Sequence, residues 1–268
     1  MSTMIALFLV LSTLAGCASE TLANVKNAAP LPTPPPADVF QVELEQIEET
    51  YYDDDGAELA VCAYEVPLLK TDSGEEAALA LVDAFNEPFA SWKTNGEALA
   101  QTAQENRELM GSSVAYTDEL HCSIYRTDRL ISVSGVHYTY TGGAHPNTIL
   151  LSWNFDLESG AFFTPAILDT ETGLHDTVLA ALKSQARQRA REAGQKPEEF
   201  FWEDYQETLA NWSNYPVSFD EEGMTVGFSP YELACYAAGS QVFQIPYEDL
   251  RDCLSEQGLA LLGLEPLS

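Results

Sequence analysis

The stretch Tyr138-Thr-Tyr-Thr-Gly-Gly-Ala-His-Pro-Asn147 joins two runs whose composition is typical of extended strands, residues 130–140 and 148–157. Within it, Gly142 and Gly143 allow backbone angles that other residues avoid, and Pro146 stiffens the exit from the turn. A short connection of this kind between two strand-like runs predicts a hairpin. The stretch therefore places two neighbouring antiparallel strands in the middle of the chain.

The segments on either side of this hairpin add strands and helices in an order that does not alternate regularly. Upstream, the residue pattern predicts strands over 39–52 and 57–69, helices over 75–108 with a break near Asn95-Gly96, and a strand over 114–125. Downstream, it predicts helices over 174–193, 198–212 and 247–255, and strands over 217–219, 224–228 and 241–245. Hairpins mixed with helices in this way are typical of an α+β fold with antiparallel sheets and packed helices.

The amino terminus carries an export signal. The apolar run from Met4 to Ala15 is too short to cross a bilayer, and it has the length of a signal-peptide core. It ends in Leu14-Ala15-Gly16-Cys17, which resembles the lipobox of bacterial lipoproteins. We therefore expect residues 1–17 to act as a lipoprotein signal, with lipid attached at Cys17 and the protein held on the extracytoplasmic face of a bacterial membrane.

Two further features bear on this expectation. No Lys or Arg precedes Cys17, although export signals normally begin with a positive charge, so the true start codon is expected upstream. Residues 18–38 contain five closely spaced prolines, which favour an extended conformation. This segment is predicted to be a tether between the lipid and the folded part.

The charge balance is strongly acidic. The sequence has 42 Asp and Glu residues against 12 Lys and Arg, which gives a formal net charge of −30. Such a surface repels nucleic acids and anionic lipid headgroups, and it attracts cationic partners. The alternative interpretation is that the acidic residues only keep the protein soluble.

Four cysteines remain once Cys17 is assigned to the lipid. Four cysteines allow three pairings, and pairing of sequence neighbours predicts the disulfides Cys62–Cys122 and Cys235–Cys253. The chain has no Cys-x-x-Cys spacing, so zinc is not predicted. Buried thiols are the remaining alternative.

The sequence shows no catalytic motif. It lacks the His-Glu-x-x-His, Gly-x-Ser-x-Gly and Ser-x-x-Lys patterns and any glycine-rich phosphate loop. With 42 acidic residues, a pair of carboxylates close enough for glycoside hydrolysis carries little information. We therefore expect a protein that is not an enzyme and that has neither cofactor nor metal.

The hairpin stretch is the most distinctive candidate for a ligand site. Gly142 and Gly143 would shape its backbone, while His145 and Asn147 would present polar groups to a ligand. The alternative is a structural turn in which His145 caps backbone groups. Exposed aromatic residues could extend a binding face, and the candidates are Trp202, Tyr205 and Trp212, although aromatic residues more often lie in the core.

Two stretches of the chain resemble a known family. The hairpin stretch 138–147, followed by Asn154-Phe-Asp-Leu-Glu-Ser-Gly160, resembles a core motif of the RsiV/PdaC-type extracytoplasmic domains. The segment Phe228-Ser-Pro-Tyr-Glu-Leu-Ala-Cys-Tyr-Ala-Ala-Gly239 is similar to the closing segment of the same family. The resemblance implies an α+β fold in two intimate parts, a smaller domain over 39–127 and an RsiV-like domain over 128–268.

The resemblance also suggests a function. In the RsiV-type anti-sigma factors this region binds lysozyme, a strongly basic enzyme, so we expect a binding or sensing module for a cationic protein such as lysozyme, or for cell-wall peptidoglycan. The sequence contains no polysaccharide-deacetylase domain, so that activity is not expected. A hydrolase of wall glycan or peptide that uses unidentified carboxylates, and a structural lipoprotein without a diffusible ligand, are the alternatives.

Overall fold

The structure is a computed structural model, and it describes residues 35–111, 113–169 and 173–265. The predicted signal peptide, the lipidation site Cys17 and all but the last residues of the predicted tether lie outside the described residues. Within the described part, no helix has both the length and the apolar composition needed to cross a bilayer.

Six strands form the larger sheet in sequence order. They are β1 (Phe40–Tyr52), β2 (Glu58–Thr71), β3 (Tyr116–Arg126), β4 (Leu130–Tyr140), β5 (Asn147–Asp156) and β6 (Ala161–Phe162). Neighbouring strands are antiparallel except β2 and β3, which pair in parallel. The sheet is thus mainly antiparallel, as the sequence predicts, and β2 and β3 are the exception because a helical crossover joins them.

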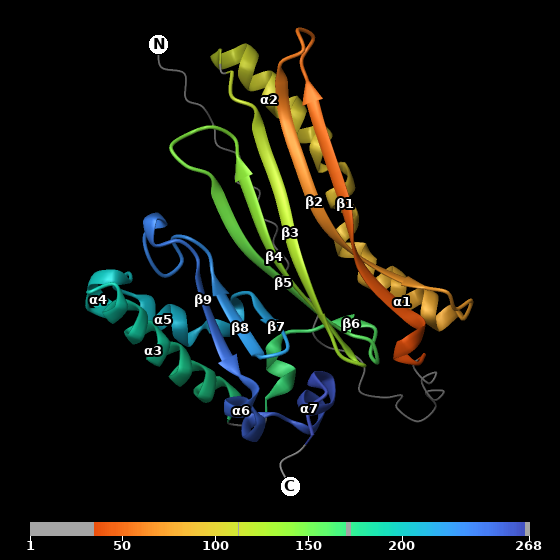
Figure 1. The fold of residues 1–268 in the computed structure, drawn as a ribbon, viewed down its shortest axis with the longest axis vertical. Coiled ribbons are helices and arrows are strands. Elements are labelled where there is room, and N and C mark those ends of the chain that lie inside the picture. The colour runs from red at the N-terminus through yellow and green to blue at the C-terminus, as the bar shows by residue number, and fades with distance from the viewer. Residues whose placement is uncertain (1–34, 112, 170–172, 266–268) are drawn as a thin grey trace, which may run out of the picture. The chain divides into compact units, whose positions relative to one another are not determined.

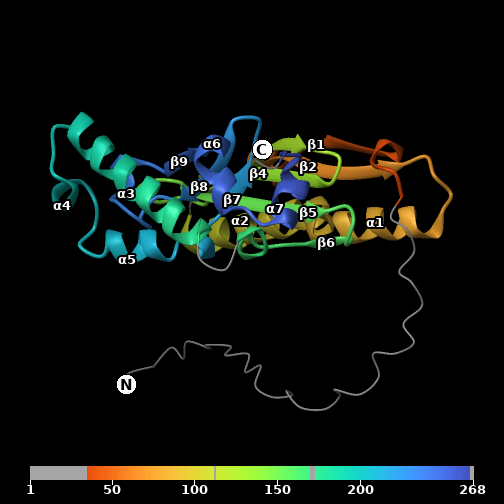
Figure 2. The ribbon, with the colours of Figure 1, turned by 90° about the horizontal axis from the view of Figure 1, so that it is seen from below.

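That crossover consists of α1 (Glu76–Asn86), the 3₁₀ helix η2 (Glu87–Thr94) and α2 (Asn95–Met110). Figures 1 and 2 show these helices on one side of β1 and β2. The second helix begins at Asn95, as predicted, while α1 ends earlier, at Asn86, because Pro88 has no N–H to continue it. Gly96 lets α2 approach the sheet closely, since a Cβ at this position would lie 2.6 Å from the hydroxyl of Tyr51.

The second part of the chain is built on a sheet of three antiparallel strands, β7 (Val217–Phe219), β8 (Gly223–Phe228) and β9 (Gln241–Pro246). Its helices are α3 (Leu174–Glu192), α4 (Pro197–Phe200), α5 (Tyr205–Ala210), α6 (Tyr247–Leu250) and α7 (Glu256–Leu262). Short 3₁₀ helices complete it, η3 (Pro165–Leu168), η4 (Trp212–Asn214), η5 (Tyr236–Ala238) and η6 (Arg251–Cys253), and η1 (Ala37–Val39) precedes β1. The predicted helix over 198–212 is therefore divided into three pieces.

Two hydrophobic cores divide the fold. One lies between the larger sheet and its helices and includes Tyr64, Phe85, Phe89 and Phe155. The other lies around α3 and the smaller sheet, where Val178, Leu182, Ala186 and Ala190 are buried on one side of α3, as its spacing predicts. The α+β fold class is confirmed.

The two hydrophobic cores follow one another along the chain. The predicted boundary between residues 127 and 128 falls in the turn joining β3 to β4, and these strands pair along their whole length. The first core continues to residue 157, and the second is formed almost wholly after it. The chain therefore leaves the first hydrophobic core and enters the second near the turn at residues 158–160.

Buried polar groups join the smaller sheet to the larger one. Ser132 donates from its hydroxyl to Asn154 Oδ1 (2.8 Å) and accepts from the backbone N–H of Phe219 (2.9 Å). The amide nitrogen of Asn154 donates to the carbonyl of Val217 (2.7 Å). These bonds fix β7 against β4 and β5, which gives Asn154 a structural role.

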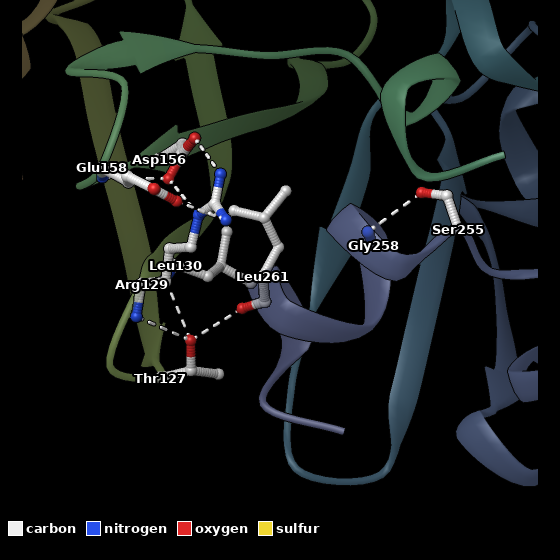
Figure 3. A network of polar contacts seen from close by, with 8 residues as sticks. All are labelled: Thr127, Arg129, Leu130, Asp156, Glu158, Ser255, Gly258 and Leu261. Carbon is white, nitrogen blue, oxygen red and sulfur yellow. Dashed lines mark hydrogen bonds and ion pairs between the residues drawn. The ribbon is translucent and has the colours of Figure 1, made fainter. Parts of the chain in front are cut away.

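The turn between β3 and β4 anchors both ends of the described chain. Arg126 donates from its guanidinium to the carbonyls of Ala37 and Phe40, where the described chain begins. Thr127 donates from its hydroxyl to the carbonyl of Leu261 in α7 (2.8 Å), as Figure 3 shows. The first and last elements of the described part therefore lie at the same end of β3.

Gly223, where β8 begins, offers a direct test of packing between strands. Gly223→Ala is expected to lower the free energy of unfolding by about 1–3 kcal/mol, the range for overpacked sites. The added Cβ would lie 2.1 Å from the carbonyl oxygen of Ile245 in β9. Urea denaturation measures the effect. Gly74→Ala is the matched control, because a Cβ there meets nothing within 4 Å, and an equal loss in both variants would contradict the packing argument.

Candidate functional site

The turn between β4 and β5 has the geometry that its two glycines predict. Gly142 and Gly143 have φ angles of 91° and 108°, which lie in the region that disfavours residues with a side chain. The Tyr140 hydroxyl donates to the carbonyl of Gly143 (3.2 Å). This hydrogen bond stabilises the turn at the end of the hairpin. His145 lies on the side of the turn that leads into β5, and it is exposed.

His145 contacts a segment that is 86 residues further along the chain. Its Nδ1 lies 2.9 Å from the carbonyl of Pro146, and its Nε2 lies 3.1 Å from the hydroxyl of Tyr231. Because a carbonyl only accepts, Nδ1 carries the proton, and in the neutral ring Nε2 accepts from Tyr231. The imidazole also stacks on Tyr236, with ring centres 3.9 Å apart and planes 18° apart.

Tyr231 has an unusual backbone. Its φ angle is 75°, the only positive value for a residue other than glycine in the part of the chain that the structure describes. The Tyr231 N–H donates to the carbonyl of Ala234, and the indole N–H of Trp202 donates to the carbonyl of Tyr231 (3.0 Å). These bonds hold a strained conformation in place, and such strain is concentrated at functional sites.

Four side chains together form what we call the His145 cluster: His145, Tyr231, Tyr236 and Trp202. Tyr231 is 54% exposed and Trp202 is 40% exposed. Of the three aromatic residues proposed from the sequence, only Trp202 lies at the surface, whereas Tyr205 and Trp212 are buried and the prediction that they are exposed is wrong. Asn147 is exposed at the start of β5, opposite Thr139.

A groove lies between the two sheets, and the sequence pattern does not predict it. Its volume is about 550 Å³, which is within the usual range for ligand pockets. One wall is the face of β3, β4 and β5 that points away from α1, and the other is formed by β7, β8 and β9. We call this space the inter-sheet groove. No single strand forms it, so a one-dimensional pattern carries no signal for it.

A buried carboxylate occupies the opposite face of the larger sheet. Asp118 accepts from the hydroxyl of Tyr64 (2.8 Å) and pairs with Nε2 of His137 (2.5 Å), which lies edge-on to Trp92. Burial is the main cause that raises the pKa of Tyr64, so this hydroxyl stays protonated and acts as a donor. These groups bind one another beneath η2, which indicates a structural role for them.

Neither predicted disulfide is present among the described residues. Cys62 lies opposite Asp118 in the parallel register of β2 and β3, so Cys122 is four residues further along. At about 3.3 Å per residue their Cα atoms are separated by about 13 Å, well beyond the 7 Å limit for a bond. Cys235 is a free, exposed thiol, while Cys253 lies in η6 with its sulfur 3.0 Å from the Thr177 hydroxyl.

The two cysteines buried in the larger sheet, Cys62 and Cys122, are not activated as nucleophiles, because burial raises the pKa of both thiols. Burial raises the pKa of the Cys122 thiol to about 12, so it remains protonated at neutral pH, where only a thiolate would be nucleophilic. Within the described ranges, no group of three or more His, Cys, Asp or Glu side chains could hold a metal ion.

Family comparisons match two segments of the chain. Residues 54–148 match the family model described as "Deacetylase PdaC", and residues 161–248 match the one described as "Protein of unknown function (DUF3298)". Residues 149–160 separate the two matched segments, and the chain passes from the first hydrophobic core to the second in the same stretch. No curated protein matches the chain.

Solved structures show the same fold. A DUF3298 family member from Bacteroides fragilis superposes with a TM-score of 0.61 at 17% identity, covering 85% of this chain and 98% of its own. A DUF3298 family protein from Pseudomonas aeruginosa gives 0.50 at 16% identity, covering 81% and 95%. At these identities the likeness concerns the fold alone. The chain is thus similar to PdaC-type domains over residues 54–148, which include its Thr-Gly-Gly-Ala-His motif, and to DUF3298 domains over residues 161–248.

Proposed function

We propose that this chain is a lipid-anchored extracytoplasmic binding or sensing module, and that the His145 cluster contacts its ligand. One observation carries the proposal. Exposed aromatic rings from two segments 86 residues apart are held together at the surface by a strained backbone at Tyr231. A fold that needed only a turn between β4 and β5 would have no use for this arrangement, whereas a ligand site benefits from rigid, exposed rings.

The chemistry of the cluster supports binding over catalysis. Both ring nitrogens of His145 are hydrogen bonded within the protein, so the ring is held in a fixed orientation. Tyr and Trp supply a large contact area at a low cost in conformational entropy, and they are enriched among the residues that dominate binding energy. The cluster therefore fits a contact surface for another molecule.

A basic protein such as lysozyme is the ligand that we propose. The formal net charge of −30 would attract a cationic partner over a distance. At contact, the faces of Tyr231, Tyr236 and Trp202 favour Lys and Arg side chains through cation–π attraction. The net charge and the aromatic surface thus both favour a basic protein as the partner. Cell-wall peptidoglycan is the second ligand to be tested.

The test measures binding of lysozyme to the chain from Ala18 onward, without lipid, by interferometry at low and at physiological salt. Tyr231→Gly is expected to weaken binding about 30-fold, as a loss of about 2 kcal/mol at a central contact would. Glycine accepts the φ of 75° without strain, so this variant removes the ring without placing another side chain in a disfavoured backbone conformation. Tyr52→Ala, which removes a ring that is 58% exposed on β1, should leave the affinity unchanged.

The outcomes separate specific binding from bulk attraction. Affinity that survives physiological salt and falls in Tyr231→Gly supports the proposal. Binding that disappears at physiological salt, or that falls equally in Tyr52→Ala, would mean charge attraction alone. If lysozyme does not bind at all while isolated peptidoglycan does, the ligand is the wall polymer.

A further inference from the structure

The inter-sheet groove is a second surface whose chemistry is distinct from that of the His145 cluster. Val136 in β4 and Val242 in β9 are half-exposed on its two sides, and Leu150 in β5 lies between them in the lining. An apolar lining left open to solvent favours a ligand that brings aliphatic groups to it.

Two acidic side chains line the groove, Glu65 and Asp220. None of the described residues that line it is Lys or Arg. His121 lies between two carboxylates, with its Nδ1 3.8 Å from Glu65 and its Nε2 3.4 Å from Glu119. The groove therefore combines aliphatic walls with a negative field.

Both carboxylates are fixed in position by backbone and amide groups. Glu65 accepts from the backbone N–H of Cys122 (3.0 Å). Asp220 accepts from the backbone N–H groups of Glu222 (2.8 Å) and Gly223 (2.9 Å), and from the side-chain amide of Gln244. Because these donors carry no net charge, they do not neutralise the two carboxylates, although the imidazole of His121 also lies beside Glu65.

We propose that the inter-sheet groove receives a basic side chain, lysine or arginine, presented on an extended peptide segment of a partner protein. Such side chains have an aliphatic stem and a cationic head, which suit the valine and leucine walls and the carboxylates respectively. A volume of about 550 Å³ holds a short peptide segment rather than a single side chain. The inference deepens the proposed function, because it assigns a second contact with the same class of partner.

The test uses a small probe, so that its result is independent of lysozyme binding. The probe is the blocked tetrapeptide acetyl-Val-Lys-Val-Lys-amide, and its control replaces both lysines with norleucine, which keeps the stem and removes the charge. Binding to the chain from Ala18 onward is followed by the chemical shifts of backbone amides. We expect saturable shifts at Ser123, Val136 and Val242, which line the groove, and at least a 10-fold weaker affinity for the norleucine peptide.

Two variants test whether the peptide binds in the inter-sheet groove. Glu65→Gln keeps an acceptor for the Cys122 N–H but removes the charge, and it should weaken peptide binding about 5-fold to 10-fold. Glu76→Gln, on an exposed position of α1, removes the same charge away from the groove and should have no effect. Val136→Trp places a bulky ring at a half-exposed position and should block the peptide without unfolding the protein.

The outcomes distinguish this inference from the proposed function. Loss of peptide binding in Glu65→Gln and Val136→Trp, with peptide binding kept in Tyr231→Gly, supports a separate site in the groove. Equal affinity for the lysine and norleucine peptides, or shifts confined to the His145 cluster, would overturn the inference and leave the proposal about that cluster unaffected.

Discussion

Phe85→Ala is expected to lower the free energy of unfolding by about 3–5 kcal/mol, the range for a buried aromatic residue truncated to alanine. Phe85 is fully buried in α1, and its ring lies 5.4 Å from those of Phe89 and Phe155 and 5.9 Å from that of Phe162. These rings join the helical crossover to β5 and β6. Truncation leaves a cavity that close-packed aromatic neighbours cannot fill.

Urea denaturation followed by far-ultraviolet circular dichroism measures this effect. Leu79→Ala is the matched control, because Leu79 lies in the same helix and is 47% exposed. The control is expected to change the free energy of unfolding by less than about 0.5 kcal/mol. Similar losses in the two variants would contradict the argument, because both substitutions raise helix propensity and only Phe85 lies in the aromatic core.

Arg129→Met is expected to lower the free energy of unfolding by about 3–5 kcal/mol at neutral pH, because it leaves the buried carboxylate of Asp156 without its arginine partner. Asp156 is 1% exposed, and Arg129 binds both of its oxygens, Nε to Oδ1 at 2.8 Å and Nη2 to Oδ2 at 3.0 Å. A third contact runs from Arg129 to Glu158 at 2.5 Å, and Figure 3 shows the arginine between the two acids. Arg187→Met, at an exposed position of α3, is the control and should be nearly neutral.

The pH dependence of the Arg129→Met effect has a definite sign. Burial acts to raise the pKa of Asp156, but hydrogen bonds from Arg129 and from the backbone of Glu158 outweigh it and hold the pKa below its usual 3.8. In the wild type this carboxylate therefore stabilises the fold above pH 3.8, and its contribution is lost as the pH falls further.

In the variant, burial without the arginine raises the pKa of Asp156, and protonation relieves the unpaired charge. The difference in the free energy of unfolding between wild type and variant should thus shrink between pH 7 and pH 4. A difference that stays constant over this range would contradict the charge argument.

Local patterns in the sequence predict elements well where one face is buried. The strand β4, from Leu130 to Tyr140, and the short strand β7, from Val217 to Phe219, have the bounds that the residue pattern predicts. In contrast, α7 was not predicted, although Ser255 marks its start by accepting a hydrogen bond from the N–H of Gly258. The signal for this cap is present in the sequence, but a helix this short has little periodicity to detect.

Features that depend on pairing between distant segments could not be predicted in the same way. The parallel register of β2 and β3 is set by the crossover, and this register is what separates Cys62 from Cys122. In the candidate site, Gly142, Gly143 and His145 were identified from the sequence, but the contact of His145 with Tyr231 was not. A positive φ at tyrosine is disfavoured locally, so only its tertiary hydrogen bonds explain it.

The hydrogen bonds of Arg126 to Ala37 and Phe40 determine how far the first described residues lie from the His145 cluster. They fix the entry of the chain beside the first residues of β4, because Arg126 pairs with Ile131. The His145 turn follows the last residue of the same strand, and eleven residues of strand rise by about 33 Å. The first described residues and the His145 cluster therefore lie at opposite ends of β4, so a partner bound at the cluster leaves the start of the described chain uncovered.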